Sequence, residues 1–208
     1  MKLGLRPAHY RLVGIAFIFL MGIVTATAQP GSQTTPQTHD EFVAAGRAAA
    51  QKGDLAGAAK WYSKAIESQP DDYDIIFARA GAYAATGKYD NALKDLNVVI
   101  AKYPKSVVAL HLRGSLYNVK KDWKKAMADA EAIIALEPAN GLGYQVRGGT
   151  YAGQKKYAEA EADLTKAISL NPRDHLSYMY RGAVYEEQGM AGKSQADKLK
   201  AEQIQRGQ

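Results

Sequence analysis

Side chains that could catalyse a reaction or bind a metal are few in this chain of 208 residues. The chain has no cysteine, which excludes thiol nucleophiles and thiolate metal sites, and its four histidines stand far apart, at positions 9, 39, 111 and 175. The sequence lacks the zinc-protease, phosphate-loop, nucleophile-elbow and dinucleotide motifs. The glycines of RGGTYAG, residues 147–153, fall within a predicted helix and indicate close packing. The sequence therefore predicts no catalytic, metal or cofactor site, and a protein that is not an enzyme.

Charged side chains recur at a regular interval instead. Arginine stands at positions 79, 113, 147 and 181 and aspartate at 95, 129, 163 and 197, so each type returns every 34 residues. Lysines gather in NVKKDWKKA, residues 118–126, and again at Lys155 and Lys156. Such recurrence indicates a repeated structural element that positions these side chains.

A period of 34 residues runs from residue 39 to residue 208 without an insertion. Five rows begin at His39, Tyr73, Val107, Gly141 and His175. Column 8 of each row is small: Gly46, Ala80, Gly114, Gly148 and Gly182. Column 11 is tyrosine in rows 2–5, and column 32 is proline in rows 1–4. A fixed period of this length is typical of stacked supersecondary units.

Each row predicts two helices joined by a turn. Columns 4, 8 and 11 share one face of the first helix, and columns 20, 24, 27 and 28 share one face of the second. The turn carries glycine in three rows and Lys121 or Lys155 in the others. Proline at column 32 ends the second helix. We therefore predict an all-α fold of five helix–turn–helix repeats, which span residues 39–72, 73–106, 107–140, 141–174 and 175–208.

These columns resemble the tetratricopeptide repeat, and the resemblance covers residues 39–208. An arginine before the column-8 residue, as in Arg113–Gly114, resembles the Arg-Gly variety of that repeat. The resemblance implies a right-handed α-α superhelix, or solenoid. Exposed apolar surface at the end of a solenoid needs a polar cover, and residues 191–205, with Lys198 and Glu202 at normally apolar columns, are predicted to be that cap.

The resemblance also assigns a role to the arginine and aspartate columns. In the family, column 7 faces the second helix of its own repeat, so an Arg–Asp ion pair is implied in repeats 2–5. Repeat 1 lacks both members. The implied pairs are Arg79–Asp95, Arg113–Asp129, Arg147–Asp163 and Arg181–Asp197. We assign them a structural role.

The function that the resemblance implies is binding of a protein partner, as a peptide or a helix, in a concave groove. The groove-lining columns in the middle of the array read Phe77, Gly81, Ala84, His111, Ser115, Asn118, Gln145, Gly149 and Ala152. Their small size leaves room for a ligand, but it also fits first helices that simply crowd one another. The lysine and asparagine columns with which co-chaperone members hold a carboxylate are not matched, so that activity is not implied.

The lysines at the turns of repeats 3 and 4 should share one edge of the stack: Lys120, Lys121, Lys124, Lys125, Lys155 and Lys156. A solvated turn explains them most simply. The alternative is a peripheral adaptor whose lysine-rich edge contacts an anionic membrane, a cell-wall surface or an acidic partner.

The N-terminus predicts export. Residues 1–28 combine three positive charges, an apolar run at 12–24 and an A-x-A sequence that ends at Ala28, which is the layout of a secretory signal peptide. Residues 29–38 read as a flexible linker. Cleavage would lower the formal net charge from +6 to about +3, a weak balance that argues against nucleic acid as the partner. We expect a periplasmic protein, with release to the medium as the alternative. The oligomeric state is not predicted.

Overall fold

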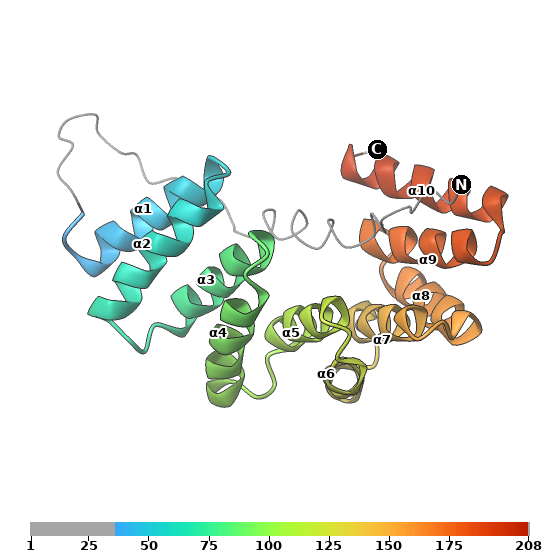
Figure 1. Cartoon of the computed structure of the whole chain (residues 1–208), viewed down its shortest axis with the longest axis horizontal. Coiled ribbons are helices and arrows are strands. Elements are labelled where there is room, and N and C mark those ends of the chain that lie inside the picture. The colour runs from blue at the N-terminus through green and yellow to red at the C-terminus, as the bar shows by residue number, and fades with distance from the viewer. Residues whose placement is uncertain (1–35, 208) are drawn as a thin grey trace, which may run out of the picture. The chain divides into compact units, whose positions relative to one another are not determined.

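The computed structural model describes residues 36–207, so the predicted signal peptide and most of the predicted linker lie outside the described residues. Within them the chain forms helices and no strand, as the repeats predict (Figure 1). The helices are α1 (His39–Gln51), α2 (Leu55–Ser68), α3 (Tyr73–Ala85), α4 (Tyr89–Lys102), α5 (Val107–Val119), α6 (Trp123–Leu136), α7 (Gly141–Gly153), α8 (Tyr157–Leu170), α9 (His175–Glu187) and α10 (Ala191–Gln205). The fold is the all-α solenoid of helix pairs that the sequence predicts.

The first helix of every pair begins at the first residue of its row because the residue before it is a side-chain cap. Each of these caps accepts a hydrogen bond from a backbone N–H in the first turn: Thr38, Asp72, Ser106, Asn140 and Asp174. Each of the four column-32 prolines stands two residues beyond the end of a second helix. The 34-residue period is therefore marked by a cap at one end and a proline near the other.

The turn inside each pair needs one residue with positive φ. Gly53, Gly87 and Gly189 provide it at φ between 73° and 79°. Lys121 and Lys155 adopt the same conformation at φ 59° and 61°. A non-glycine residue pays a steric penalty of roughly 1–2 kcal/mol in this region.

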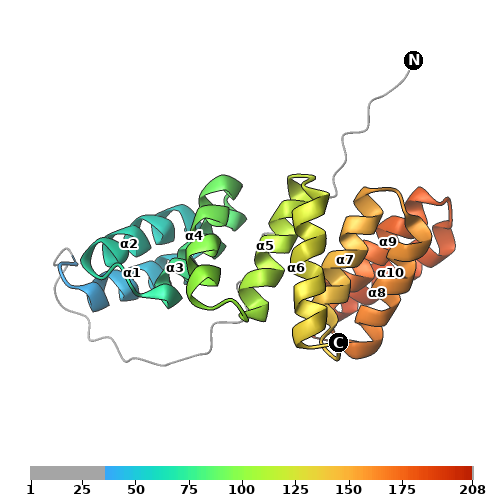
Figure 2. The same ribbon diagram turned by 90° about the horizontal axis from the view of Figure 1, so that it is seen from below.

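The described helices fall into two compact units, unit 1 up to residue 102 and unit 2 from residue 103. In unit 1, α2 packs against both α1 and α3, and α3 packs against α4. In unit 2, α7 lies between α6 and α8, and α9 packs against α8 and α10 (Figure 2). The first helices α5, α7 and α9 of unit 2 also contact one another in sequence, which makes them one continuous row.

Small residues at column 8 bring the two helices of a pair together. A Cβ placed on Gly46 would lie 2.5 Å from the Tyr62 ring, and one on Gly148 would lie 2.7 Å from Cγ of Leu164. Both distances are too short for real side chains. Tyr62 and Leu164 are fully buried beneath these glycines.

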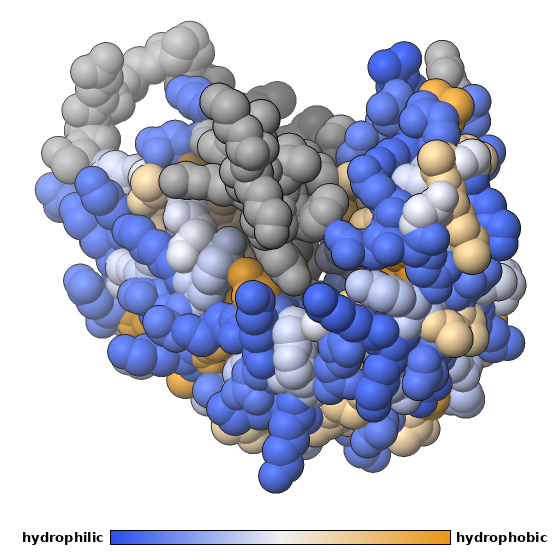
Figure 3. Space-filling model, turned by 45° about the vertical axis from the view of Figure 1, so that its right-hand side comes forward, coloured by the Kyte–Doolittle hydropathy of each residue, from blue (hydrophilic) through white to orange (hydrophobic). Residues whose placement is uncertain are grey.

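The last helix, α10, is the polar cap. Its buried residues are Ser194, Asp197 and Ala201, whereas Leu199 is 49% exposed. The face of the molecule in Figure 3 is largely hydrophilic where residues are coloured, with scattered hydrophobic ones. No helix within residues 36–207 is both long and apolar enough to cross a membrane.

Candidate functional site

The predicted groove residues fall on three first helices. Phe77, Gly81 and Ala84 are on α3 in unit 1, whereas the other six are on α5 and α7 in unit 2. In unit 2, hydrogen bonds join the two helices. Asn118 Nδ2 donates to the backbone carbonyl of Val146 at 2.9 Å, and Thr150 Oγ1 donates to Asn118 Oδ1 at 2.8 Å. These bonds fix α5 against α7.

A polar chain continues from α5 through α7 to α9. His111 Nε2 donates to Oε1 of Gln145 at 2.7 Å, which requires the tautomer with its proton on Nε2. Gln145 Nε2 in turn donates to Asp174 Oδ2 at 2.5 Å. Ser177 Oγ also donates to Asp174 Oδ2 at 2.5 Å. Burial lowers the pKa of His111, and the hydrogen bond to Gln145 and the charge of Asp174 oppose this shift only in part.

This network corrects part of the predicted groove. Gln145 is only 2% exposed because its amide is occupied on both sides, so its side chain cannot present itself to a ligand. Ala84 is also buried, at 8% exposure. A Cβ on Gly149 would meet Asn118 Nδ2 at 3.2 Å, a tight contact with the end of one side chain, so this glycine fits both a groove and crowded helices. Ala152 packs against the core cluster of Ala160, Leu164 and Val184.

The other groove residues are half-buried: Phe77 and Gly81 on α3, His111, Ser115 and Asn118 on α5, and Gly149 and Ala152 on α7. Of the three on α5, His111 and Asn118 hydrogen-bond to α7, so Ser115 is the position at which a substitution leaves those bonds in place. In unit 2 the candidate surface therefore comprises half-buried residues of α5 and α7, and the buried Gln145 is excluded from it.

All four Arg–Asp pairs implied by the sequence are present as two-pronged ion pairs. In each, Nε and Nη2 of the arginine donate to the two carboxylate oxygens at 2.7–2.9 Å. The aspartate side chains are 5–12% exposed and the arginine side chains 16–26% exposed. The hydrogen bonds to the aspartates raise the pKa of each arginine. These pairs clamp the two helices of a repeat, and in each of them both carboxylate oxygens of the aspartate accept a hydrogen bond from the arginine.

Arg79 and Arg181 also bind the preceding repeat. Arg79 Nη1 donates to Ser63 Oγ at 3.0 Å, and Arg181 Nη1 donates to Thr165 Oγ1 at 2.9 Å. Ser63 and Thr165 occupy the same column, one repeat before their arginine. A bond between neighbouring repeats could have been found from that column.

The tyrosines of column 11 provide rings for cations, a role that the sequence reasoning missed. The guanidinium carbon of Arg79 lies 5.7 Å from the Tyr83 ring centroid, and that of Arg181 lies 5.8 Å from Tyr185. Lysine approaches some of these rings as well, with Lys193 Nζ 4.9 Å from Tyr185. Burial, aided by a hydrogen bond to Glu161, raises the pKa of Tyr185 to about 12.

The predicted lysine-rich edge comes from two turns of unit 2. Lys120 and Lys121 lie in the turn after α5, and Lys155 and Lys156 occupy the equivalent turn after α7. Lys124 and Lys125 follow in the first turn of α6. All six lysines are exposed, and Lys125 forms a 2.7 Å ion pair with Asp122.

Within residues 36–207 no group of three or more His, Asp or Glu side chains could hold a metal ion. His39 instead lies 3.0 Å from Asp72 and 3.1 Å from the Ala65 carbonyl, where it ties α1 to the end of α2. Its two nitrogens are thereby engaged in structural contacts.

Comparisons with known proteins support the repeat architecture. Family models described as tetratricopeptide repeats match residues 49–116 and 143–174. The comparison with curated proteins gives no match.

Solved structures of repeat proteins share the fold. MamA from Desulfovibrio magneticus RS-1, residues 41 to the end, aligns with a TM-score of 0.64 and 18% identity over 84% of this chain and 99% of that one. A thermophilic TPR protein of Thermus thermophilus aligns with a TM-score of 0.69 and 17% identity over 79% of this chain and 90% of that one. A tetratricopeptide repeat protein of Parabacteroides merdae aligns with a TM-score of 0.69 and 24% identity over 76% of this chain and 62% of that one. At these identities the likeness concerns the fold.

Proposed function

We propose that this chain is a non-catalytic scaffold that binds a protein partner, as a peptide or a helix, along the first helices of its repeats. Matches to tetratricopeptide repeats support a role in protein interaction, since stacked helix pairs of this kind present extended surfaces. The observation that carries the proposal is the row of α5, α7 and α9, which the chain His111–Gln145–Asp174 fixes before any partner arrives. A preorganised surface loses little conformational entropy on binding.

The partner would lie on the α5 side of that row. Gln145 and its hydrogen-bond partners form the fixed base, and Ser115 is a small half-buried residue one helical turn after His111 on α5. A helix with an apolar stripe or an extended peptide could cover such a surface.

Substitution of Ser115 by arginine tests this placement. The protein is used to capture partners from an envelope extract, and the retained proteins are identified by mass spectrometry. Ser115→Arg should lose the partners while its circular dichroism stays unchanged. Ser169→Arg, on the exposed side of α8, is the matched control and should keep them. Equal retention by both variants would exclude the α5 side of the row as the binding surface.

We further propose that the protein acts outside the cytoplasm, in the periplasm of an envelope with two membranes. The signal-peptide pattern of residues 1–28 supports this location. Sequencing the N-terminus of the protein from fractionated cells checks it, with Gln29 expected as the first residue. An intact Met1 in a cytoplasmic fraction would contradict the proposal.

A further inference from the structure

We propose that the lysine-rich edge contains a second binding site, which takes an acidic peptide segment with one bulky apolar side chain. The site is an open hollow of about 820 Å³ between α6 and the end of α7, and we call it the edge hollow. Pockets of about 300–1,000 Å³ accommodate ligands of small-molecule size, or one anchoring side chain with its neighbours. All residues of the hollow belong to unit 2.

The apolar part of the edge hollow is aromatic. Trp123 and Met127 come from α6 and Tyr151 from α7, and all three side chains remain partly exposed. Trp123 lies against Gly153, where any Cβ would overlap its ring. The missing side chain at residue 153 thus gives the indole a fixed position. Partly exposed aromatic rings in a hollow suit an apolar anchor, which gains by removing them from water.

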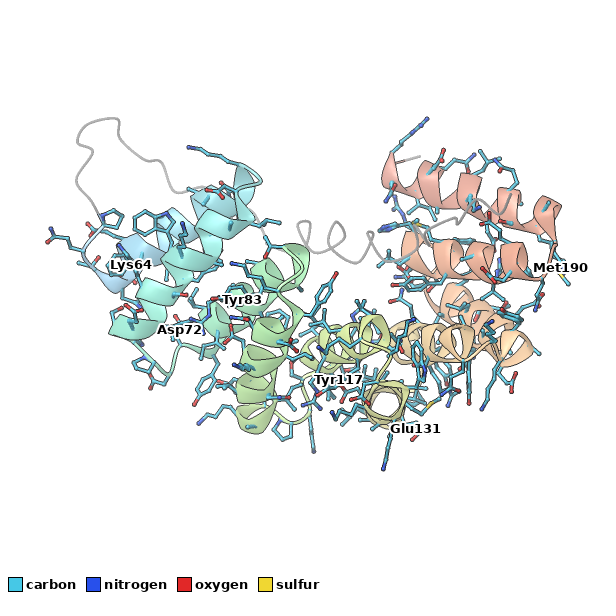
Figure 4. The ribbon with its side chains drawn as sticks, viewed as in Figure 1. Lys64, Asp72, Tyr83, Tyr117, Glu131 and Met190 are labelled. Atoms are coloured by element: carbon cyan, nitrogen blue, oxygen red, sulfur yellow. The ribbon has the colours of Figure 1, made fainter. Side chains whose placement is uncertain are left out.

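The charged part of the edge hollow is positive. Lys121, Lys124 and Lys156 contribute to the lining. The carboxylate of Asp122 is neutralised by Lys125, and Glu131, labelled on α6 in Figure 4, is the other acid of the lining. Three lysines against one unneutralised acid favour an acidic ligand.

The backbone at this place supports a role beyond a solvated turn. Lys121 adopts a left-handed conformation at a position where three other repeats have glycine. The chain therefore carries a conformational cost at the site where the lysine lines the edge hollow. Backbone strain is one of the marks of functional sites, and Lys155 shows the same strain at the second turn of the lysine-rich edge.

A peptide explains these features better than a membrane surface does. The aromatic side chains form the lining of a hollow and would not reach into a bilayer, and Glu131 would repel anionic headgroups. A peptide can insert one apolar side chain between Trp123 and Tyr151 while acidic neighbours meet the lysines. The site uses residues other than the α5 surface proposed above, so it does not depend on that proposal.

The probe is a fluorescein-labelled peptide of five acidic residues around one central phenylalanine. Fluorescence anisotropy measures its binding to the protein, and the same peptide with alanine in place of phenylalanine measures the contribution of the anchor. The phenylalanine peptide should bind at least about tenfold more tightly. Equal binding of the two peptides would overturn the proposal, since attraction to lysines alone would then suffice.

Ala128→Glu is the blocking variant, because Ala128 is exposed and lines the edge hollow. Ala162→Glu is its control: Ala162 is also exposed, stands at the same column one repeat later on α8, and changes the net charge equally. Ala128→Glu should weaken binding at least about tenfold and Ala162→Glu less than about twofold. Equal losses would indicate only a general charge effect and would overturn the proposal.

Retention on vesicles of phosphatidylcholine and phosphatidylglycerol without peptide binding would instead assign the edge to a membrane. The Ser115→Arg variant should still bind the peptide, which separates the two sites.

Discussion

Removal of Arg147 tests how much one Arg–Asp clamp stabilises a repeat. Among the four pairs, Arg147–Asp163 is the cleanest, because no hydrogen bond to the preceding repeat has to be separated from it, unlike Arg79 and Arg181. Arg147→Ala leaves the Asp163 carboxylate, 12% exposed, without the two donors at 2.7 and 2.9 Å. Bidentate bonds of this kind are among the stronger ones in proteins.

The expected loss in the free energy of unfolding follows from the burial of the two partners. Stranding a fully buried charge costs roughly 3–5 kcal/mol. Asp163 is not fully buried and the deleted side chain admits water, so we expect a loss of about 2–3 kcal/mol for Arg147→Ala. Asp163→Ala should cost less, about 1–2 kcal/mol, because the guanidinium of Arg147 is 26% exposed and can reach water.

The double variant decides between pairing and independent effects. Urea unfolding gives the free energies, and hydrogen exchange of the α7 and α8 amides localises the loss, since a repeat array need not unfold as one unit. The double variant should lose about 2–3 kcal/mol, so the coupling amounts to about 1–2 kcal/mol. Arg173→Ala, at an exposed position, is the control and should change stability by less than about 0.5 kcal/mol. A double-variant loss equal to the sum of the single losses would refute the clamp.

Three more changes probe other parts of the structure. Because burial lowers the pKa of His111, the unfolded chain takes up a proton below the ordinary value of 6.5 before the folded one does, so the free energy of unfolding should fall as the pH drops from 7.5 to 5.5. His111→Gln should flatten that dependence in urea unfolding, and an unchanged slope would contradict the buried neutral ring. Lys121→Gly, which relieves the left-handed residue, should raise the free energy of unfolding by up to about 1 kcal/mol, and a loss of stability would contradict the strain. Gly148→Ala should lower the melting temperature, with a loss of about 1–3 kcal/mol, because its methyl group would lie 2.7 Å from Leu164; an unchanged melting temperature would show that this contact yields easily.

The sequence allows much of the fold to be predicted because the same physical demand returns every 34 residues. Gly148 or Pro138 taken alone does not predict a structure. The recurrence of small residues at column 8 and of prolines at column 32 does predict one. The Arg–Asp pairs could be predicted for the same reason. In every pair the arginine and the aspartate are separated by the same number of residues, and repeat 1 lacks both.

The groove was harder to predict because its residues do not repeat. Gln145 was expected to line it, yet hydrogen bonds with His111 of the preceding repeat and with Asp174, the cap of α9, hold it in a buried position. Column reasoning treats Gln145 and Phe77 as equivalent, although their environments differ. The aromatic hollow at Trp123 was missed because it combines the first turn of one helix with the end of another, and only the folded chain brings them together.

The first repeat has no Arg–Asp clamp, and this difference affects which substitutions the repeats can tolerate in evolution. Repeat 1 has Trp61 at the aspartate column, stacked on Phe42 with ring centroids 6.3 Å apart, and Lys64 lies 4.9 Å from the indole. A substitution of one clamp member alone passes through a state with a stranded charge, which is selected against by the instability it causes. Duplication of a whole repeat copies both members at once and avoids that state. The clamps therefore favour growth of the array by copying complete repeats, whereas a repeat without a clamp, like the first, can accept single substitutions at those two columns without that penalty.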